Sequence, residues 1–225
     1  MKQKTKTNGP EDYADVFGVT YFPDRSGTYK IEINDVIYKA GQFSDAIFAL
    51  ENAKEEDAVE IYLQSPGGSI DAGDALIHAM RGCKAHIHIK ATGNCSSMAS
   101  AILLEAHSFE LSEGFNSLLH CGSVGYGGTY HEFDQASKFY QKSMPAFIKR
   151  TYTGFLTEDE IEQLIGGKDF WIDAEEWVAR HEARNDFQKS LMEAHLKKLE
   201  KAARKPRVKK SVKTVVDNSN KPVVE

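Results

Sequence analysis

Residues 86–106, HIHIKATGNCSSMASAILLEA, decide the fold class that we predict for this chain. Isoleucine alternates with other residues over 86–90, which indicates a β-strand, and the apolar residues from 97 to 106 favour a helix. A short turn of small residues lies between them. A strand that turns directly into a helix is the repeating unit of α/β proteins with a largely parallel sheet.

The same turn makes Ser97 a candidate nucleophile. It places the serine at or near a helix N-terminus, where free N–H groups and the positive end of the helix favour an oxyanion. A serine hydroxyl is a weak nucleophile until a base takes its proton. Taken alone, the position is more typical of an N-cap serine that only stabilises the helix. Ser96, directly before it, is a rival nucleophile.

A second turn offers backbone donors for such a site. The strand expected at 59–63 ends in Ser65-Pro66-Gly67-Gly68. Glycine lets the backbone approach a ligand closely and leaves its N–H free to point into a cleft. If this turn lies opposite Ser97, the N–H groups of Gly68 and Met98 would form an oxyanion hole. The alternative is an ordinary β-to-α turn.

A histidine and an aspartate complete the candidate set. His120 ends an apolar strand, and active sites of α/β sheets gather at strand ends; the alternative is a satisfied core histidine. Asp169 precedes the strand at 170–172 and could orient a histidine. Asp173 competes for that role, but it opens a capping box with Glu176, which gives it a structural function.

Strands and helices alternate along much of the remaining chain, as expected for helices on the faces of a mostly parallel sheet. Hydrophobic periodicity predicts a strand or hairpin at 29–38, helices at 43–50, 71–80 and 131–150, and short strands at 109–111 and 117–120. Thr157 and Glu160 form another capping box. A helical apolar stripe continues towards Pro206 through Phe187, Leu191, Ala194 and Leu199.

Composition indicates a globular protein with one sizeable core. The chain has 225 residues, 41% of them hydrophobic, and no apolar run as long as a membrane span. Its polar first residues contain no apolar segment typical of a secretory signal. The three cysteines lack metal-ligand spacing, and the pair His86 and His88 lacks a third ligand. We therefore expect a cytoplasmic protein with reduced thiols and no metal site.

Charge is distributed unevenly. Residues 184–214 contain 11 Lys or Arg and three acidic residues, a balance of +8, so the rest of a chain whose total is −5 carries −13. We expect a flexible arm at 1–17, a folded body at 18–183, and a basic tail at 184–225 that is helical and then disordered. The tail is either a solvated appendage or a segment that contacts an acidic partner or nucleic acid.

In their order and spacing, these motifs resemble those of the proteolytic subunit of the Clp protease (ClpP) over residues 29–182. That family has a strand ending in Ser-Pro-Gly-Gly, a turn ending in Ser-Met-Ala, and a strand ending in the catalytic histidine, with a Gly-Gly pair soon after. A long helix, an aspartate before an apolar strand and an Asp-Ala-Glu-Glu type of helix start follow. The matching residues are Ser65–Gly68, Ser97–Ala99, His120, Gly127–Gly128, Asp169 and Asp173–Glu176.

The resemblance implies an α/β fold of the ClpP/crotonase-like class with a projecting handle helix, here at about 131–165. It implies a serine endopeptidase without a cofactor, in which Ser97 is the nucleophile, His120 the base and Asp169 the residue that orients the base. The implied oxyanion donors are Gly68 and Met98. The residues implied to lie along the bound peptide are Gly67, Ser69 and Ile70.

The resemblance also implies partners. In that family the handle helix joins two seven-membered rings into a barrel, so we expect a homo-oligomer of heptameric rings stacked in pairs. The exposed aromatic residues expected on 131–150 suit such an interface. The expected substrate is an unfolded polypeptide or a scaffold or capsid protein, and an AAA+ unfoldase is a candidate partner.

Some residues depart from the family pattern. The family usually has Gln-Pro after its histidine, where this chain has Cys121-Gly122, and alanines before its serine, where this chain has Cys95 and Ser96. These departures suggest a divergent branch, such as phage-encoded head-maturation proteases that act without an ATPase. Two other readings remain open: a coenzyme A-using relative of the same fold, and a non-catalytic ring-forming scaffold.

Overall fold

The computed structural model describes residues 17–23, 27–123, 125 and 127–203. They belong to two compact units, Met1–Asp186 and Phe187–Glu225, so the first unit extends slightly beyond the body expected at 18–183. The expected N-terminal arm lies outside the described residues except for Phe17. This residue is buried and stacks on Phe43 with ring centroids 5.0 Å apart, so the folded body includes it.

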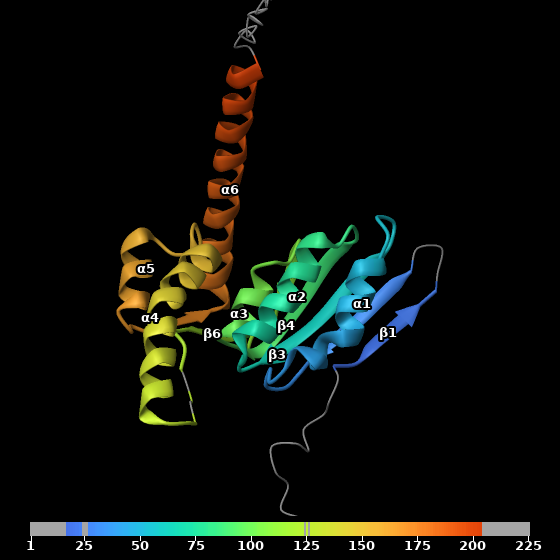
Figure 1. The fold of residues 1–225 in the computed structure, drawn as a ribbon. Helices are drawn as coiled ribbons and strands as arrows, with labels where there is room; N and C mark the ends of the chain where they lie inside the picture. Colours follow the sequence, from blue (N-terminus) through green and yellow to red (C-terminus); the bar gives the residue numbers. More distant parts are fainter. Residues whose placement is uncertain (1–16, 24–26, 124, 126, 204–225) are drawn as a thin grey trace, which may run out of the picture. The chain divides into compact units, whose positions relative to one another are not determined.

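A seven-stranded sheet runs through the first unit in the order β1-β2-β3-β4-β6-β7, with β5 paired to β4 (Figure 1). Strands β2 to β6 pair in parallel, whereas β1 and β7 run antiparallel to β2 and β6. The strands are β1 Val19–Phe22, β2 Thr28–Ile33, β3 Ala58–Ser65, β4 His86–Cys95, β5 Ser108–Leu111, β6 Asn116–Leu119 and β7 Phe170–Asp173. This is the mixed α/β class expected from the sequence.

Side chains alternate between the two faces of the central strands. On β3, Val59, Ile61 and Leu63 are buried, whereas Glu60 and Tyr62 are partly exposed on the other face. The helices α1 Ser44–Asn52, α2 Ile70–Gly82 and α3 Met98–Leu103 cover the apolar face (Figure 1). The core of the first unit therefore lies between one face of the sheet and these three helices.

Several element boundaries differ from the sequence prediction. The strand or hairpin expected at 29–38 ends at Ile33, and its antiparallel partner is the preceding strand, β1. Strand β4 is longer than the expected 86–90 and runs to Cys95, because the small residues near its end still pair with β3 and β6. Helix α3 is correspondingly shorter and ends at Leu103.

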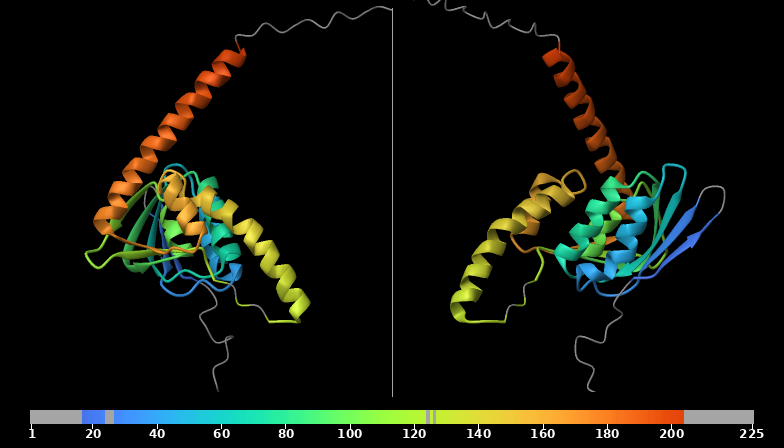
Figure 2. Two further views of the ribbon diagram at one scale, coloured as in Figure 1. Left: turned by 90° about the vertical axis from the view of Figure 1, so that its left-hand side faces the viewer. Right: turned by 45° about the vertical axis from the view of Figure 1, so that its right-hand side comes forward.

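The described chain also contains a 3-10 helix, η1 Ala40–Phe43, directly before α1, and three further α-helices: α4 Tyr130–Tyr152, α5 Glu158–Ile165 and α6 Ala174–Ala203. Helix α4 is a single long helix that extends away from the sheet, as Figure 2 shows, and it corresponds to the expected handle helix. The handle expected at 131–165 is not one helix, because α4 ends at Tyr152 and α5 is separate. Thr129 and Thr157 begin α4 and α5 with capping boxes.

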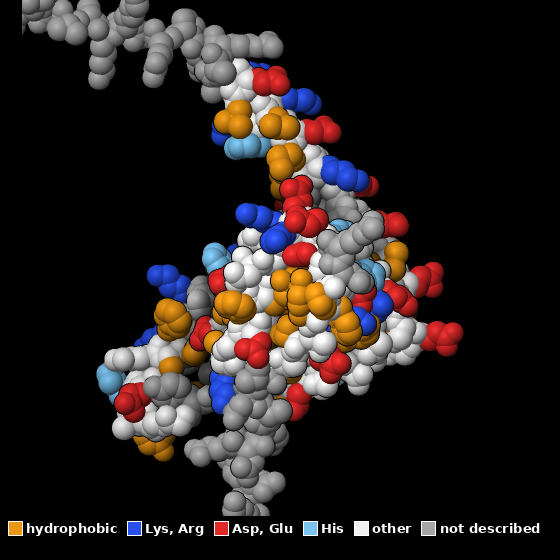
Figure 3. All heavy atoms as spheres, turned by 90° about the vertical axis from the view of Figure 1, so that its right-hand side faces the viewer, with side chains coloured by type: hydrophobic (Ala, Val, Ile, Leu, Met, Phe, Trp, Pro, Cys, Tyr) orange, Lys and Arg blue, Asp and Glu red, His pale blue; other side chains and the backbone are white. Residues whose placement is uncertain are grey.

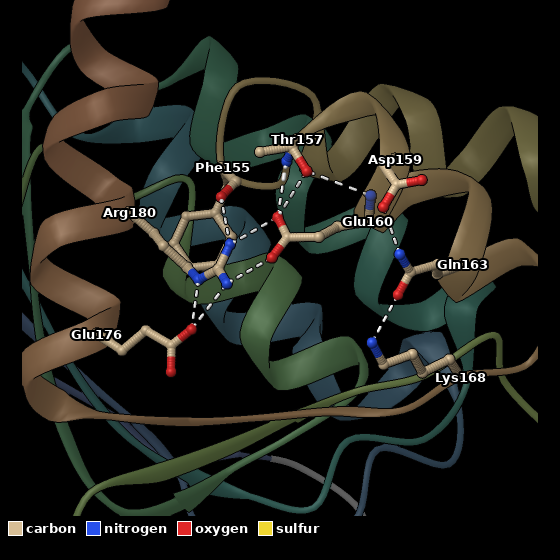
Figure 4. A network of polar contacts seen from close by, with 8 residues as sticks. All are labelled: Phe155, Thr157, Asp159, Glu160, Gln163, Lys168, Glu176 and Arg180. Carbon is tan, nitrogen blue, oxygen red and sulfur yellow. Dashed lines mark hydrogen bonds and ion pairs between the residues drawn. The ribbon is translucent and has the colours of Figure 1, made fainter.

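An ion-pair network joins α5 to the first turns of α6 (Figure 4). The Nη atoms of Arg180 lie 2.7 and 2.9 Å from the carboxylate oxygens of Glu160, and its Nε lies 2.8 Å from Glu176. Glu160 also accepts the N–H of Thr157 at 2.9 Å. Its hydrogen bonds with the Arg180 guanidinium lower the pKa of Glu160 to about 2. The network fixes the two helices that precede and follow β7.

Candidate active site

Ser97 lies in a strained turn between β4 and α3. Its φ of 55° and ψ of −122° belong to the first central position of a type II′ turn, which usually requires glycine. Among the described residues, it alone combines a side chain with a positive φ. Its N–H donates to the carbonyl of Leu118 at 2.7 Å, and its carbonyl accepts the N–H of Ser100 at 3.0 Å. Backbone strain that the surroundings maintain in this way is concentrated at functional sites.

His120 is the nearest base to this serine. Its Nε2 lies 2.7 Å from Ser97 Oγ. The histidine directly follows β6, and β6 pairs with the end of β4 through Asn94 and Asn116. This pairing brings the two side chains together from different strands. With the other ring nitrogen protonated, Nε2 accepts the hydroxyl proton, as a general base requires.

Ser96 is held differently from its neighbour. It is buried, and its hydroxyl accepts the N–H of Leu118 at 2.9 Å and donates to the side chain of Asn94. Asn94 lies near the end of β4, and Leu118 lies in β6. The geometry therefore gives Ser96 a structural role in joining β4 to β6 and leaves Ser97 as the serine that faces the histidine.

Asp169 is close to His120 in the sheet register. Strands β6 and β7 pair antiparallel with Leu119 opposite Phe170, so His120 and Asp169 are the next positions in register. Residues directly opposite each other have Cβ atoms about 5 Å apart. Asp169 is exposed, and within the described part of the chain its carboxylate forms no hydrogen bond or ion pair. The fold thus places Ser97 and His120 in contact and the aspartate beside them without a contact.

The other candidates from the sequence lie elsewhere. Asp173 is opposite Asn116 in the register, and its carboxylate accepts the N–H of Glu176 at 2.9 Å, as a cap does. His86 and His88 each lie 2.8 Å from the hydroxyl of Ser108 on the neighbouring strand. Across the residues described, no three His, Cys, Asp or Glu side chains are arranged to hold a metal ion.

The glycine turn lies directly against Ser97. A Cβ atom on Gly67, whose φ is 90°, would be 2.7 Å from the N atom of Met98 and 2.8 Å from the Cβ of Ser97. Gly68 forms a bridge with Ile37 that uses the carbonyl of Gly67 and the N–H of Ser69, not the N–H of Gly68 itself. The Gly68 amide therefore points away from this bridge.

Two buried side chains hold this turn: Gln42, which no sequence motif singled out, and Ser65, which the sequence indicated only as the first residue of the turn. Gln42 accepts the N–H groups of Tyr38 and Lys39 at 2.6 and 3.1 Å, and so fixes the loop that carries Ile37. Ser65 donates to the carbonyl of Asp35 at 2.7 Å.

The sequence carried a weak signal for both residues. Each is a polar residue beside a predicted apolar core segment, where a polar side chain needs a backbone partner.

The serine–histidine pair and the glycine turn border a cleft of about 610 Å³. Ser97 and His120 line it together with Gly68, an expected oxyanion donor. The residues expected to lie along a peptide also line it: Gly67, Ser69 and Ile70. The side chain of Met98 is buried in the core near Gly73, whereas its backbone N atom lies beside the glycine turn.

A second cavity of about 300 Å³ adjoins the cleft along α4, and Cys121, Tyr140 and Met144 line both. Phe133, Pro145 and Ile165 make the second cavity largely apolar. Burial raises the pKa of the Cys121 thiol, so it remains protonated near neutral pH. The combined lining accommodates apolar side chains beside the serine–histidine pair.

None of the described helices is long and apolar enough to cross a membrane. The model of the family described as Clp protease matches residues 23–180. The chain is 26% identical over 179 residues to the ATP-dependent Clp protease proteolytic subunit 2 of Treponema denticola, covering 79% of this chain and 86% of that protein. It is 28% identical over 141 residues to the subunit 2 of Tropheryma whipplei, covering 61% and 77% of the two chains. A subunit of Deinococcus radiodurans is 28% identical over 94 residues, covering 41% and 46%.

Proposed function

The chain belongs to the Clp protease family, and from this premise we propose that it is a serine endopeptidase that uses Ser97, His120 and Asp169. One observation carries the proposal. Ser97 Oγ lies 2.7 Å from His120 Nε2 in a strained turn at the wall of a cleft. Acyl transfer requires a nucleophilic hydroxyl, a base that can take its proton, and space beside them for the substrate carbonyl.

The first half of the reaction forms an acyl-enzyme. Ser97 Oγ attacks the peptide carbonyl carbon as its proton moves to His120 Nε2, and the carbonyl oxygen becomes an oxyanion. The N–H groups of Gly68 and Met98 donate to that oxygen. His120 then gives its proton to the leaving amine as the C–N bond breaks. In the second half, a water molecule attacks the ester carbonyl carbon as His120 takes its proton. The ester C–O bond then breaks, His120 returns the proton to Ser97 Oγ, and the acid product leaves.

Asp169 would hold the imidazole in the required tautomer. Its carboxylate needs to accept the Nδ1–H of His120 and to stabilise the positive charge that forms on the ring. Two observations support this role: His120 and Asp169 are opposite positions in the continued register of β6 and β7, and the side chain of Asp169 is exposed. We infer that this contact forms when a peptide occupies the cleft.

The substrate that suits the cleft is an extended, unfolded polypeptide. Gly67, Ser69 and Ile70 line one wall, and glycine at this wall lets a peptide backbone approach closely. The relatives are named as proteolytic subunits of an ATP-dependent protease. We accordingly infer that this chain acts as a homo-oligomer of stacked heptameric rings fed by an AAA+ unfoldase. The exposed aromatic side chains of α4 that would support ring stacking are Tyr130, Phe133 and Phe139.

Covalent labelling tests the proposal. The full-length chain is treated with a fluorophosphonate probe, and the modified residue is located by peptide mass spectrometry. We expect the label on Ser97, its loss in Ser97→Ala, and its retention in Ser96→Ala. Hydrolysis of a small fluorogenic peptide should follow the same pattern.

A folded, assembled sample without labelling and without hydrolysis would instead indicate a non-catalytic scaffold. Hydrolysis that persists undiminished in Ser97→Ala would assign the chemistry to another residue.

A further inference from the structure

We propose that Tyr152 and Ser100 are positioning residues for Ser97, acting through a buried chain of hydroxyl groups. The inference rests on the proposed function, because it concerns how the nucleophile is held. Tyr152 ends helix α4, and Ser100 lies in α3, three residues after Ser97. Both side chains are almost completely buried, with exposed fractions of 3% and 0%.

The hydrogen bonds form a directed chain. Ser100 Oγ lies 2.6 Å from the carbonyl oxygen of Ser97 and 2.8 Å from the hydroxyl of Tyr152. A carbonyl can only accept, so the single hydroxyl proton of Ser100 goes to Ser97. Tyr152 must then donate to Ser100. Donors arranged in series polarise one another, which strengthens the last bond, to Ser97.

The hydrogen bond from Ser100 to the Ser97 carbonyl restrains the peptide group between Ser97 and Met98. The backbone of Ser97 is in a glycine-like conformation with a φ of 55°, and its N–H is fixed on Leu118. The carbonyl of Ser97 accepts the N–H of Ser100 and also the hydroxyl of Ser100, which in turn is hydrogen-bonded to Tyr152. Both peptide groups around the strained residue are therefore held. The direction of its Oγ towards His120 depends on both.

Tyr152 is suited to a permanent donor role. Burial raises the pKa of its phenol to about 12, so the hydroxyl keeps its proton throughout the neutral range. The positive charge of Arg184 lowers the pKa of Tyr152, but by less than burial raises it. The Nη1 of Arg184 donates to the carbonyl of Leu104 at 2.5 Å. Leu104 caps the end of α3. Helix α3 is thus held at its start by α4 and at its end by α6.

Kinetics of two matched variants test the proposal in the full chain. Tyr152→Phe keeps the ring and removes the donor. Ile148→Val removes one methylene from a buried residue one turn earlier on the same helix and leaves the hydroxyl chain intact. We expect Tyr152→Phe to lower kcat for a small peptide about tenfold with KM within about twofold, the scale of one buried hydrogen bond lost. Ile148→Val should leave kcat within about twofold.

Ser100→Ala should reproduce the effect of Tyr152→Phe, and the double variant should be no worse than either single variant, because all three break one chain. Unchanged kcat in Tyr152→Phe, or an equal loss in Ile148→Val, would overturn the proposal. If wild-type protein shows neither hydrolysis nor fluorophosphonate labelling, the proposed function fails, and the positioning claim is decided by hydrogen exchange alone.

Hydrogen exchange measures the hold on Ser97 without any activity. The readout is the exchange rate of the amides over residues 97–103, which include the N–H groups bonded to Leu118 and to the Ser97 carbonyl. Tyr152→Phe should increase that rate severalfold, whereas Ile148→Val should not. Equal exchange in wild type and Tyr152→Phe would refute the positioning role, whatever the enzyme does.

Discussion

At the scale of single residues, the candidate site depends on backbone conformations that side chains normally avoid. Ser97 and Gly68 both have positive φ, at 55° and 142°, and lie on two different turns. For glycine the conformation costs little, whereas for serine it costs roughly 1–3 kcal/mol. A strained serine therefore needs surrounding contacts, and the bonds to Leu118 and Ser100 supply them.

Gly68→Ala tests the proposed role of the Gly68 N–H as an oxyanion donor. A Cβ atom at this position would lie 2.1 Å from the carbonyl oxygen of Ile37, so the turn must shift. Loss of one oxyanion donor lowers kcat by about 10²–10³. We expect a loss of that size in peptide hydrolysis, with the assembly unchanged in sedimentation. Gly82→Ala is the matched control, because a Cβ at that position meets nothing within 4 Å.

Asp169→Asn and Asp173→Asn separate the two candidate aspartates. An amide at 169 cannot hold the imidazole tautomer or stabilise its charge, and the comparable change in a serine protease triad lowers kcat about 10⁴-fold. At 173 the residue caps α6 through the N–H of Glu176, and asparagine caps equally well. We expect activity to fall steeply in the first variant and to stay within about twofold in the second. The reverse ranking in kcat would transfer the orienting role to Asp173.

At the scale of elements, the sequence predicted best those helix and strand ends that a single local motif determines. The capping box at Thr157 and Glu160 begins α5 as expected, and the run Ser65–Gly68 ends β3. Local patterns did not show that β4 continues to Cys95, because that extension depends on pairing with distant strands.

The contacts that organise the candidate site are also long-range. The proximity of Ser97 and His120 could be expected only from the ordered set of motifs. The buried residues Gln42 and Tyr152 belong to no sequence motif. Gln42 acts through a hydrogen bond to the loop just before it, and Tyr152 through a hydrogen bond to Ser100, which is far away in the sequence. A single sequence thus indicates the candidate catalytic residues better than the buried residues that hold them in position.

Glu160→Gln tests the network between α5 and α6 (Figure 4). Glutamine at this position can still complete the capping box, so the change mainly removes the charge that faces Arg180. The pKa of Glu160 is lowered in the folded chain from 4.5 to about 2. The stability that it contributes is therefore fully present above pH 4.5 and is lost as the pH falls towards 2.

We expect wild type to be more stable than Glu160→Gln in denaturant unfolding at pH 7, and the difference to shrink steadily below about pH 4.5. Glu162→Gln is the control, because its partner Lys149 is largely exposed and such pairs contribute about 0–1 kcal/mol. A difference that is independent of pH would show that the charge of Glu160 does not stabilise the fold.

At the scale of the whole molecule, exposed apolar surface supports the inferred assembly. Figure 3 shows hydrophobic side chains gathered on the side that carries β1 and α1. On these elements Tyr21, Phe22 and Phe48 are 50%, 46% and 69% exposed. Apolar side chains gathered on one face are typical of protein–protein contacts. A second copy of the chain is the partner expected there, in line with the proposed rings.

Two truncations test where the catalytic body ends. The compact first unit includes residues to Asp186, and Arg184 is buried with its Nη1 on the carbonyl of Leu104. A chain that stops after Asp186 should therefore cleave a small peptide as fast as the full chain. It should also lose any salt-sensitive binding to nucleic acid or to an acidic protein, because such binding scales with the positive charges engaged.

A chain that stops after Glu182 lacks Arg184 and leaves the end of α3 without its donor. Loss of a buried, charge-assisted hydrogen bond costs about 1.5–3 kcal/mol, so this shorter chain should unfold at a lower temperature and hydrolyse peptide more slowly. Thermal unfolding, sedimentation and peptide cleavage of the two truncations decide the matter. If the chain ending at Asp186 sediments as a monomer and loses cleavage, residues from Phe187 onwards are needed for assembly, and the basic segment is not a separable, partner-facing tail.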